Sequence, residues 1–186
     1  PVNSEILGES ARALEPDIKQ VVVTGPFAGE ELERRLYVAR KHYEKRIAKE
    51  FPDNPKAGYI PSLSTKTIVY KGMLTSMQLR EYFKDLSHPY FTSAITLVHS
   101  RFSTNTFPTW DLAQPFRLIG HNGEINTIRG NRSWMGAHES VLHPKGLGDM
   151  KSLGPIVQEG MSDSASLDNA LEFFVMSGLS LPHALA

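Results

Sequence analysis

Residues whose chemistry suits ligand binding are concentrated in one stretch of the sequence, residues 99–135. Arginine and asparagine side chains there crowd around two short apolar segments, and glycines interrupt the stretch. Such a concentration of polar groups between apolar segments indicates a ligand pocket rather than a solvated surface. The residues are Arg101, Asn105, Asn122, Glu124, Asn126, Arg129, Asn131 and Arg132, with Gly120, Gly123 and Gly130.

The dipeptide Asn122-Gly123 has two compatible interpretations. Asn-Gly most often marks a tight hairpin turn. A glycine backbone N–H and an asparagine side-chain N–H at a strand end can also form an oxyanion hole, which donates to the negative oxygen of a tetrahedral intermediate. A turn could orient these two N–H donors toward the same point, so the hairpin-turn and oxyanion-hole interpretations are compatible and both stay open.

Two further charged residues each have a structural and a ligand-binding interpretation. Arg101 could form a structural ion pair or clamp a carboxylate through two hydrogen bonds. Asp163 lies between two serines ahead of a helix and is by default an N-cap, although its carboxylate would also suit an ammonium group. Together the two residues could hold the charged ends of an α-amino acid if the fold brings them together.

Strands are expected on both sides of this polar stretch. Residues 94–100 alternate so that Ile95, Leu97 and His99 share one face with Arg101, which would place Arg101 where the core opens. Residues 116–120 predict a second strand that leads into the Asn-Gly turn. Further strands are predicted at residues 20–24 and 66–73.

Helices are predicted from spacing and end signals at four places. Residues 30–51 show apolar positions at three- and four-residue steps, and their charged residues predict a solvated face. Ser76 can cap a helix over residues 77–86. Asn126 or Thr127 can cap one that runs to His138, and residues 166–176 carry an apolar stripe that Gly178 ends.

Composition excludes several classes of function. The formal net charge of zero argues against a protein that mainly neutralises nucleic-acid phosphates, and no apolar segment is long enough to span a bilayer. The chain has no Cys, so it has no disulfides or thiolate metal ligands, and its seven His residues show no metal-binding spacing. No metal site is therefore predicted, and the default localisation is cytoplasmic.

Three segments together resemble a known family: HSRFSTNTFPTW, QPFRLIGHNGEINTIRGNRSWM and MSDSASLDNALE. They are similar, over nearly all of residues 60–186, to the glutaminase domain of the glutamate synthase large subunit, a class II, N-terminal-nucleophile amidotransferase. The resemblance implies that residues 1–186 are part of a single such domain. It also implies an α+β fold, a four-layer αββα sandwich with two antiparallel sheets whose N-terminal strands are missing here.

The resemblance further implies hydrolysis of L-glutamine to glutamate and ammonia. Arg101 would bind the glutamine α-carboxylate, Asp163 its α-amino group, and Asn122 with Gly123 would form the oxyanion hole. Residues 102–110 would close over the substrate, with Phe102, Thr104 and Asn105 as contacts.

The parent enzyme that the resemblance implies would carry its cofactors outside this chain. The ammonia would pass to a synthase domain of the same polypeptide, where FMN and an iron–sulfur cluster serve its combination with 2-oxoglutarate. A small reductase subunit or ferredoxin is a further implied partner. The resemblance implies no binding to nucleic acid or to a membrane.

The sequence departs from that family at the nucleophile, which in the family is an N-terminal Cys whose α-amino group acts as the base. This chain begins with Pro1 and contains no Cys. We therefore expect a fragment of a larger polypeptide that is inactive alone. The alternative is a non-catalytic amino-acid-binding or interaction module derived from the same fold.

Overall fold

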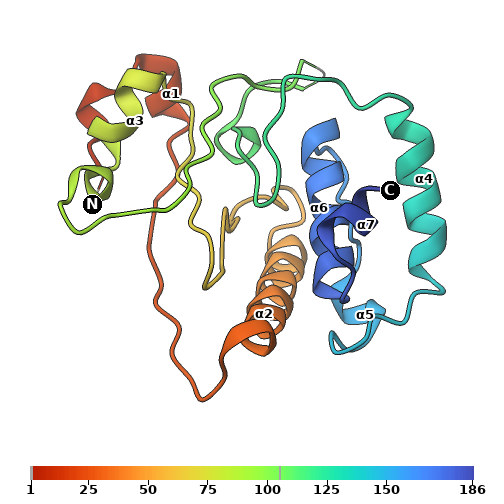
Figure 1. Ribbon diagram of the computed structural model, residues 1–186. Helices are drawn as coiled ribbons and strands as arrows, with labels where there is room; N and C mark the ends of the chain where they lie inside the picture. The colour runs from red at the N-terminus through yellow and green to blue at the C-terminus, as the bar shows by residue number, and fades with distance from the viewer. Residues whose placement is uncertain (1, 105) are drawn as a thin grey trace.

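The computed structural model describes residues 2–104 and 106–186, and the regular structure within them is helical (Figure 1). Two helices dominate, α2 (Gly29–Glu50) and α6 (Asp163–Met176), which pack against each other. The others are the 3-10 helices η1 (Ser4–Ile6), η2 (Lys84–Ser87) and η3 (Trp110–Leu112), and α1 (Glu9–Ala13), α3 (Ser76–Tyr82), α4 (Ile128–Glu139), α5 (Met150–Leu153) and α7 (Leu181–Leu185).

The expected αββα sandwich with antiparallel sheets was wrong for the residues that the structure describes. Their only strand-type pairing is an isolated antiparallel bridge between Val2 and Phe83. The four segments predicted as strands have no ladder partners. The apolar side chains of residues 20–24 and 94–100 face solvent, with Val22 and Ile95 each 87% exposed, whereas Phe116 at the start of residues 116–120 is buried. β-Branched residues favour an extended backbone, but a sheet forms only where a second strand accepts the hydrogen bonds of the first. Pairing of that kind is long-range, so the local pattern could not establish it.

Helix α2 confirms the helix predicted for residues 30–51, but the prediction of a solvated charged face holds only in part, because some of its charged residues are exposed and others are buried. Arg40 is only 2% exposed and Lys41 4%, whereas Tyr43, predicted on the apolar face, is 39% exposed. Arg40 forms ion pairs with Glu44 on its own helix and with Glu172 on α6. A charged face can be buried when another element supplies the opposite charges, and spacing within one helix does not reveal that.

The main apolar cluster lies where α2, α5 and α6 meet. Tyr37 of α2 packs there with Leu153 of α5, Phe173 of α6 and Ile156 of the following loop. Each of these side chains is at most 3% exposed. This cluster holds the two long helices in a fixed relation, and α6 carries the polar residues described below.

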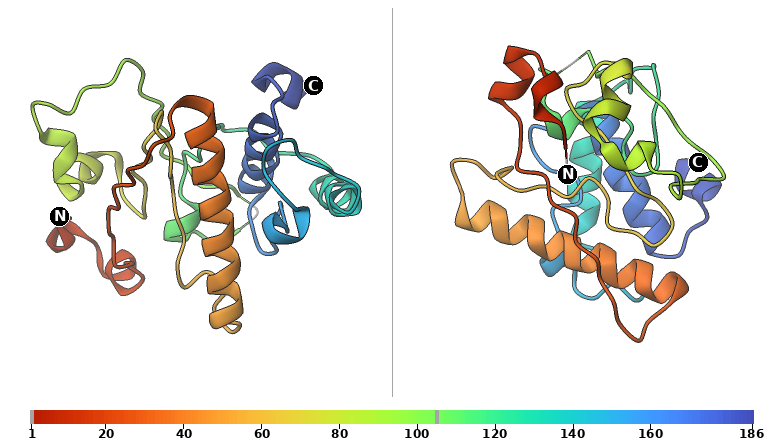
Figure 2. Two further views of the ribbon diagram at one scale, coloured as in Figure 1. Left: turned by 90° about the horizontal axis from the view of Figure 1, so that it is seen from below. Right: turned by 90° about the vertical axis from the view of Figure 1, so that its left-hand side faces the viewer.

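A second apolar cluster forms at the opposite end of the molecule, around α1 and α3 (Figure 2). Tyr82 and Trp110 lie at its centre with ring centroids 5.6 Å apart. Helix α3 begins with a reciprocal capping box, in which the Thr75 hydroxyl accepts from the Gln78 backbone N–H and the Gln78 side chain accepts from the Thr75 N–H. The helix predicted after Ser76 is therefore confirmed, with its N-cap one residue earlier.

Helices α4 and α6 confirm the two helices predicted in the second half of the chain. Thr127 is the N-cap residue of α4. At α6 the N-cap is Ser162, whose hydroxyl accepts from the Ala165 N–H, so Asp163 is the first helical residue rather than the cap. No helix of the described residues is both long and apolar enough to cross a membrane.

Candidate functional site

Three segments of the chain meet at the start of α6. They are the beginning of the loop at residues 102–110, the turn at residues 121–125 and the first turn of α6 itself. The hydroxyl of Ser164 lies at their junction, 3.0 Å from Ser103 Oγ and 2.8 Å from His121 Nε2. Thr104 adds a link between loop and turn, because its hydroxyl donates to Glu124 at 3.0 Å. The fold thus brings together residues that are far apart in sequence.

Asp163 anchors the turn at residues 121–125 to α6. Its Oδ2 accepts from the Ile125 N–H at 2.9 Å, and its Oδ1 accepts from the Ser164 N–H at 2.7 Å. The residue is only 2% exposed. Burial alone would favour the neutral acid, but the hydrogen bonds from Ile125, Ser164 and Ser103 outweigh it and hold the pKa of Asp163 below its usual value. Asp163 is therefore a carboxylate at neutral pH, as an ammonium ligand must be.

A second carboxylate, Asp168, holds the segment that leads into the turn. Its Oδ1 accepts from the backbone N–H groups of Leu118 at 2.7 Å and Ile119 at 3.2 Å, and its Oδ2 accepts from that of Arg117 at 3.2 Å. Asp168 is fully buried. Because residues 117–119 have no sheet partner, this carboxylate takes over the role that strand pairing was expected to have. Sequence reasoning missed it, although acidic residues four apart at 168 and 172 on a mostly apolar helix were a signal.

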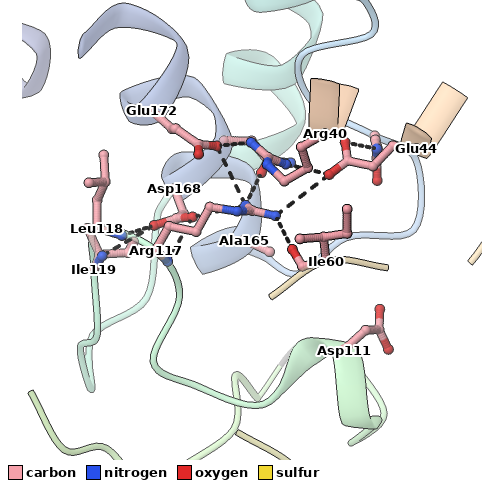
Figure 3. A network of polar contacts seen from close by, with 12 residues as sticks. Arg40, Glu44, Ile60, Asp111, Arg117, Leu118, Ile119, Ala165, Asp168 and Glu172 are labelled. Atoms are coloured by element: carbon pink, nitrogen blue, oxygen red, sulfur yellow. Dashed lines mark hydrogen bonds and ion pairs between the residues drawn. The ribbon is translucent and has the colours of Figure 1, made fainter. Parts of the chain in front are cut away.

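A network of buried charges surrounds Asp168 and the segment at residues 117–119 (Figure 3). The Arg117 guanidinium donates to Asp168 Oδ2 at 3.4 Å, to Asn169 Oδ1 at 3.1 Å and to the Ile60 carbonyl at 3.2 Å. It also lies within 4 Å of carboxylates on α2 and α6, those of Glu44 and Glu172. Burial opposes ionisation of Glu44, but the neighbouring cations led by Arg40 outweigh it and lower the pKa of Glu44. The network ties α2, α6 and the segment at residues 116–120 together.

Two histidines that were not predicted as site residues shape the turn. The ring of His99 places Nε2 2.8 Å from the His121 carbonyl oxygen, and its Nδ1 accepts from the Arg101 backbone N–H at 3.1 Å. The His121 N–H in turn donates to the side chain of Gln114 at 3.1 Å. These bonds bring the segment before Arg101 against the residue before Asn122.

The predicted site residues differ in how they are held. Asn122 and Gly123 form a bend, and both are exposed between the anchored residues His121 and Ile125. Arg101 is exposed, and its guanidinium makes no hydrogen bond or ion pair with the described residues, so the structure does not join it to Asp163. Phe102 is half-buried and Thr104 contacts Glu124, whereas Asn105 lies outside the described residues.

Comparison with known proteins gives a consistent result over the full length of the chain. Residues 1–186 match the family described as glutamine amidotransferases class-II. The chain is 49% identical over 184 residues to ferredoxin-dependent glutamate synthase 2 of Synechocystis sp., covering 97% of this chain and 11% of that protein. It is 48% identical to a glutamate synthase [NADH] of Schizosaccharomyces pombe, covering 100% of this chain and 9% of the relative.

A third relative extends the range of named electron donors. The chain is 44% identical to a glutamate synthase [NADPH] large chain of Azospirillum brasilense, with 98% of this chain and 12% of that protein covered. The chain thus spans roughly a tenth of the length of each of these relatives. Proteins named for ferredoxin, NADH and NADPH resemble it about equally, so these residues do not distinguish the donor.

Proposed function

Because the chain belongs to the class II glutamine amidotransferases, we propose that residues 1–186 are part of one glutaminase domain within a glutamate synthase. In the parent enzyme this domain hydrolyses L-glutamine. The C–N bond of the side-chain amide breaks, the carbon gains an oxygen from water, and glutamate and ammonia leave. The whole-chain family match is the observation that carries this proposal.

The anchored turn supports the assignment of an oxyanion hole. In the proposed reaction, negative charge develops on the side-chain carbonyl oxygen of glutamine, and Asn122 Nδ2 with Gly123 N–H donates to it. An oxyanion hole acts only if its donors are already in position when the charge develops. Hydrogen bonds to His121 on one side and to Ile125 on the other limit the movement of this bend.

Two side chains of opposite charge, those of Arg101 and Asp163, are proposed to bind the charged ends of glutamine. The exposed guanidinium of Arg101 can take the α-carboxylate through two parallel hydrogen bonds. Asp163 can take the α-ammonium group, because each carboxylate oxygen has more than one lone-pair site and its backbone donors leave capacity. In this proposal Phe102, Thr104 and Asn105 belong to the loop that closes over the substrate.

In the family that the chain resembles, the nucleophile is an N-terminal Cys, and since this chain contains no Cys we propose that another part of the parent polypeptide supplies it. We expect the 186-residue chain to release no ammonia from glutamine by itself. In the parent, the ammonia passes to a synthase domain of the same polypeptide, which holds FMN and an iron–sulfur cluster and combines it with 2-oxoglutarate. Ferredoxin or a small reductase subunit supplies the electrons, and the parent works in the cytoplasm.

Glutamate release from glutamine by the parent polypeptide tests the proposal. The variant Asn122→Ala should lower kcat by about 100- to 1000-fold, the effect of removing one oxyanion-hole donor. Asn54→Ala is the matched control, since Asn54 is exposed in the loop that follows α2. An Asn122→Ala enzyme that turns over at the parental rate would refute the oxyanion-hole assignment, and a parent without glutaminase activity would refute the function.

A further inference from the structure

A small polar pocket lies between the loop after α2 and the segment at residues 111–117, apart from the turn at residues 121–125. Its volume is about 60 Å³. That size suits a few water molecules or one small polyatomic ion, and it excludes a substrate the size of a nucleotide. The residues that matter for its chemistry are Lys56, Lys71, Asp111, Arg117, Gln158 and Asn169.

Lys71 is the least compensated charge in this pocket. The residue is only 8% exposed, yet its ammonium group forms no ion pair with the described residues. It donates one hydrogen bond, to the Asp111 carbonyl oxygen at 2.6 Å, and lies 4.7 Å from the centroid of the Phe116 ring. An ammonium group has three donors, so two of them lack an acceptor among the described residues.

Arg117 also lines this pocket, and one of its donors is unused. Its terminal nitrogens bind Asp168, Asn169 and the Ile60 carbonyl, but its buried Nε has no hydrogen-bond partner among the described residues. Burial, followed by the nearby charge of Arg117, lowers the pKa of Lys71 to about 7. The excess of positive charge beside the cavity is therefore that of Lys71 alone, because Arg117 already lies within 4 Å of the carboxylates of Asp168, Glu44 and Glu172.

The acidic residues of the pocket do not remove that excess. The Asp111 carboxylate pairs with Lys56 at 3.2 Å. Glu44 is already paired with Arg40 and lies 3.2 Å from Lys41. The carboxylates lining the pocket are therefore matched to other cations. Asn169 and Gln158 add side-chain amides. Gln158 Nε2 already donates to Glu44 at 3.1 Å, and its second amide hydrogen and the NH₂ group of Asn169 can donate to an oxygen atom.

We infer that this pocket binds a small oxyanion, held by the Lys71 ammonium group with the Arg117 guanidinium and the neighbouring amides. The oxyanion can be a carboxylate or an inorganic anion such as phosphate, because both present oxygen atoms to nitrogen donors. A metal cation is excluded by the surplus of positive charge. The inference does not depend on the glutaminase activity, since none of the residues proposed for glutamine binding lines the pocket.

Acylation of individual lysines in the parent polypeptide, measured by peptide mass spectrometry, tests this inference. Only the neutral amine reacts, so an anion that keeps Lys71 protonated and covered should slow its acetylation by N-hydroxysuccinimide acetate at pH 7.5. We expect at least a five-fold slowing in saturating sodium phosphate or sodium acetate relative to sodium chloride at equal ionic strength. Exposed Lys49 is the internal control and should react at the same rate in all three salts.

A thermal-unfolding experiment gives an independent readout. The same anion should raise Tm in the wild type and in Lys49→Met but not in Lys71→Met. Protection by phosphate alone identifies an inorganic oxyanion site, and protection by acetate alone identifies a carboxylate site. If neither anion protects Lys71 beyond chloride, the pocket holds only water and the inference is wrong. The acylation result stands even if Lys71→Met fails to fold.

Discussion

Replacing Asp168 tests whether one buried carboxylate holds the segment before the turn. In Asp168→Ala the backbone N–H groups of Arg117, Leu118 and Ile119 lose their acceptor. A buried donor left without a partner costs about 1–3 kcal/mol, and at the low end three of them cost about 3 kcal/mol. The Arg117 guanidinium also loses one partner, although Glu172 remains 3.7 Å away. We therefore expect Asp168→Ala to lower the free energy of unfolding by about 3–5 kcal/mol.

Asp168→Asn separates geometry from charge. The amide oxygen can replace Oδ1, which accepts from Leu118 and Ile119, but the amide NH₂ then faces the N–H of Arg117 as donor against donor. About 2 kcal/mol should be lost, because only one of the three backbone donors is left unpaired while the charge is removed as well. In the parent enzyme this variant should also lower kcat for glutamine hydrolysis more than it raises KM, since the segment leads into the proposed oxyanion hole.

Urea unfolding followed by circular dichroism measures both variants. Asp53→Ala is the matched control, because Asp53 is exposed and a surface substitution changes stability by less than about 0.5 kcal/mol. A loss below 1 kcal/mol for Asp168→Ala would refute the reasoning, since it would mean that the three backbone groups find other partners at little cost.

Three further predictions concern glycines and the buried lysine. Gly72→Ala would place a methyl group into the buried ring of Trp110 and should cost about 1–3 kcal/mol in thermal unfolding. Gly136→Ala meets open space inside α4 and should stabilise by about 0.5–1 kcal/mol; destabilisation there would contradict the helical assignment. The unfolded chain keeps the Lys71 proton up to its ordinary pKa of 10.5, whereas in the folded chain burial and Arg117 lower the pKa to about 7. The free energy of unfolding should therefore rise between pH 7 and 10.5 by at most about 1.4 kcal/mol per pH unit. Urea unfolding measured across this pH range should show the rise in the wild type and not in Lys71→Met.

Local sequence signals predicted the helices well. The spacing of apolar residues identified the helices at residues 30–51 and 166–176, because a helix forms from neighbours along the chain and its period is visible in them. The same reasoning was wrong about the strands. Residues 94–100 alternate as a strand should, but alternation does not specify which segment supplies the matching hydrogen bonds.

Charge was the second place where local reasoning was insufficient. Arg40 looks like a surface residue within its own helix, and only the approach of Glu172 from α6 makes its burial possible. Asp168 likewise gains its role from residues 117–119, about fifty positions earlier in the chain. The energetic balance of a buried charge depends on partners brought close by folding, and no window of neighbouring residues contains them.

The sequence by itself determined the family of this protein, its main helices and the residue types of the candidate site, because motifs and helical periods are local properties. Only the tertiary structure decided that Ser103, His121 and Ser164 meet, that Asp163 fixes the turn, and that Asp168 replaces the expected sheet partner. These contacts join segments far apart in the chain. Their free energy exists only once the intervening residues are ordered, and therefore local sequence patterns could not predict them.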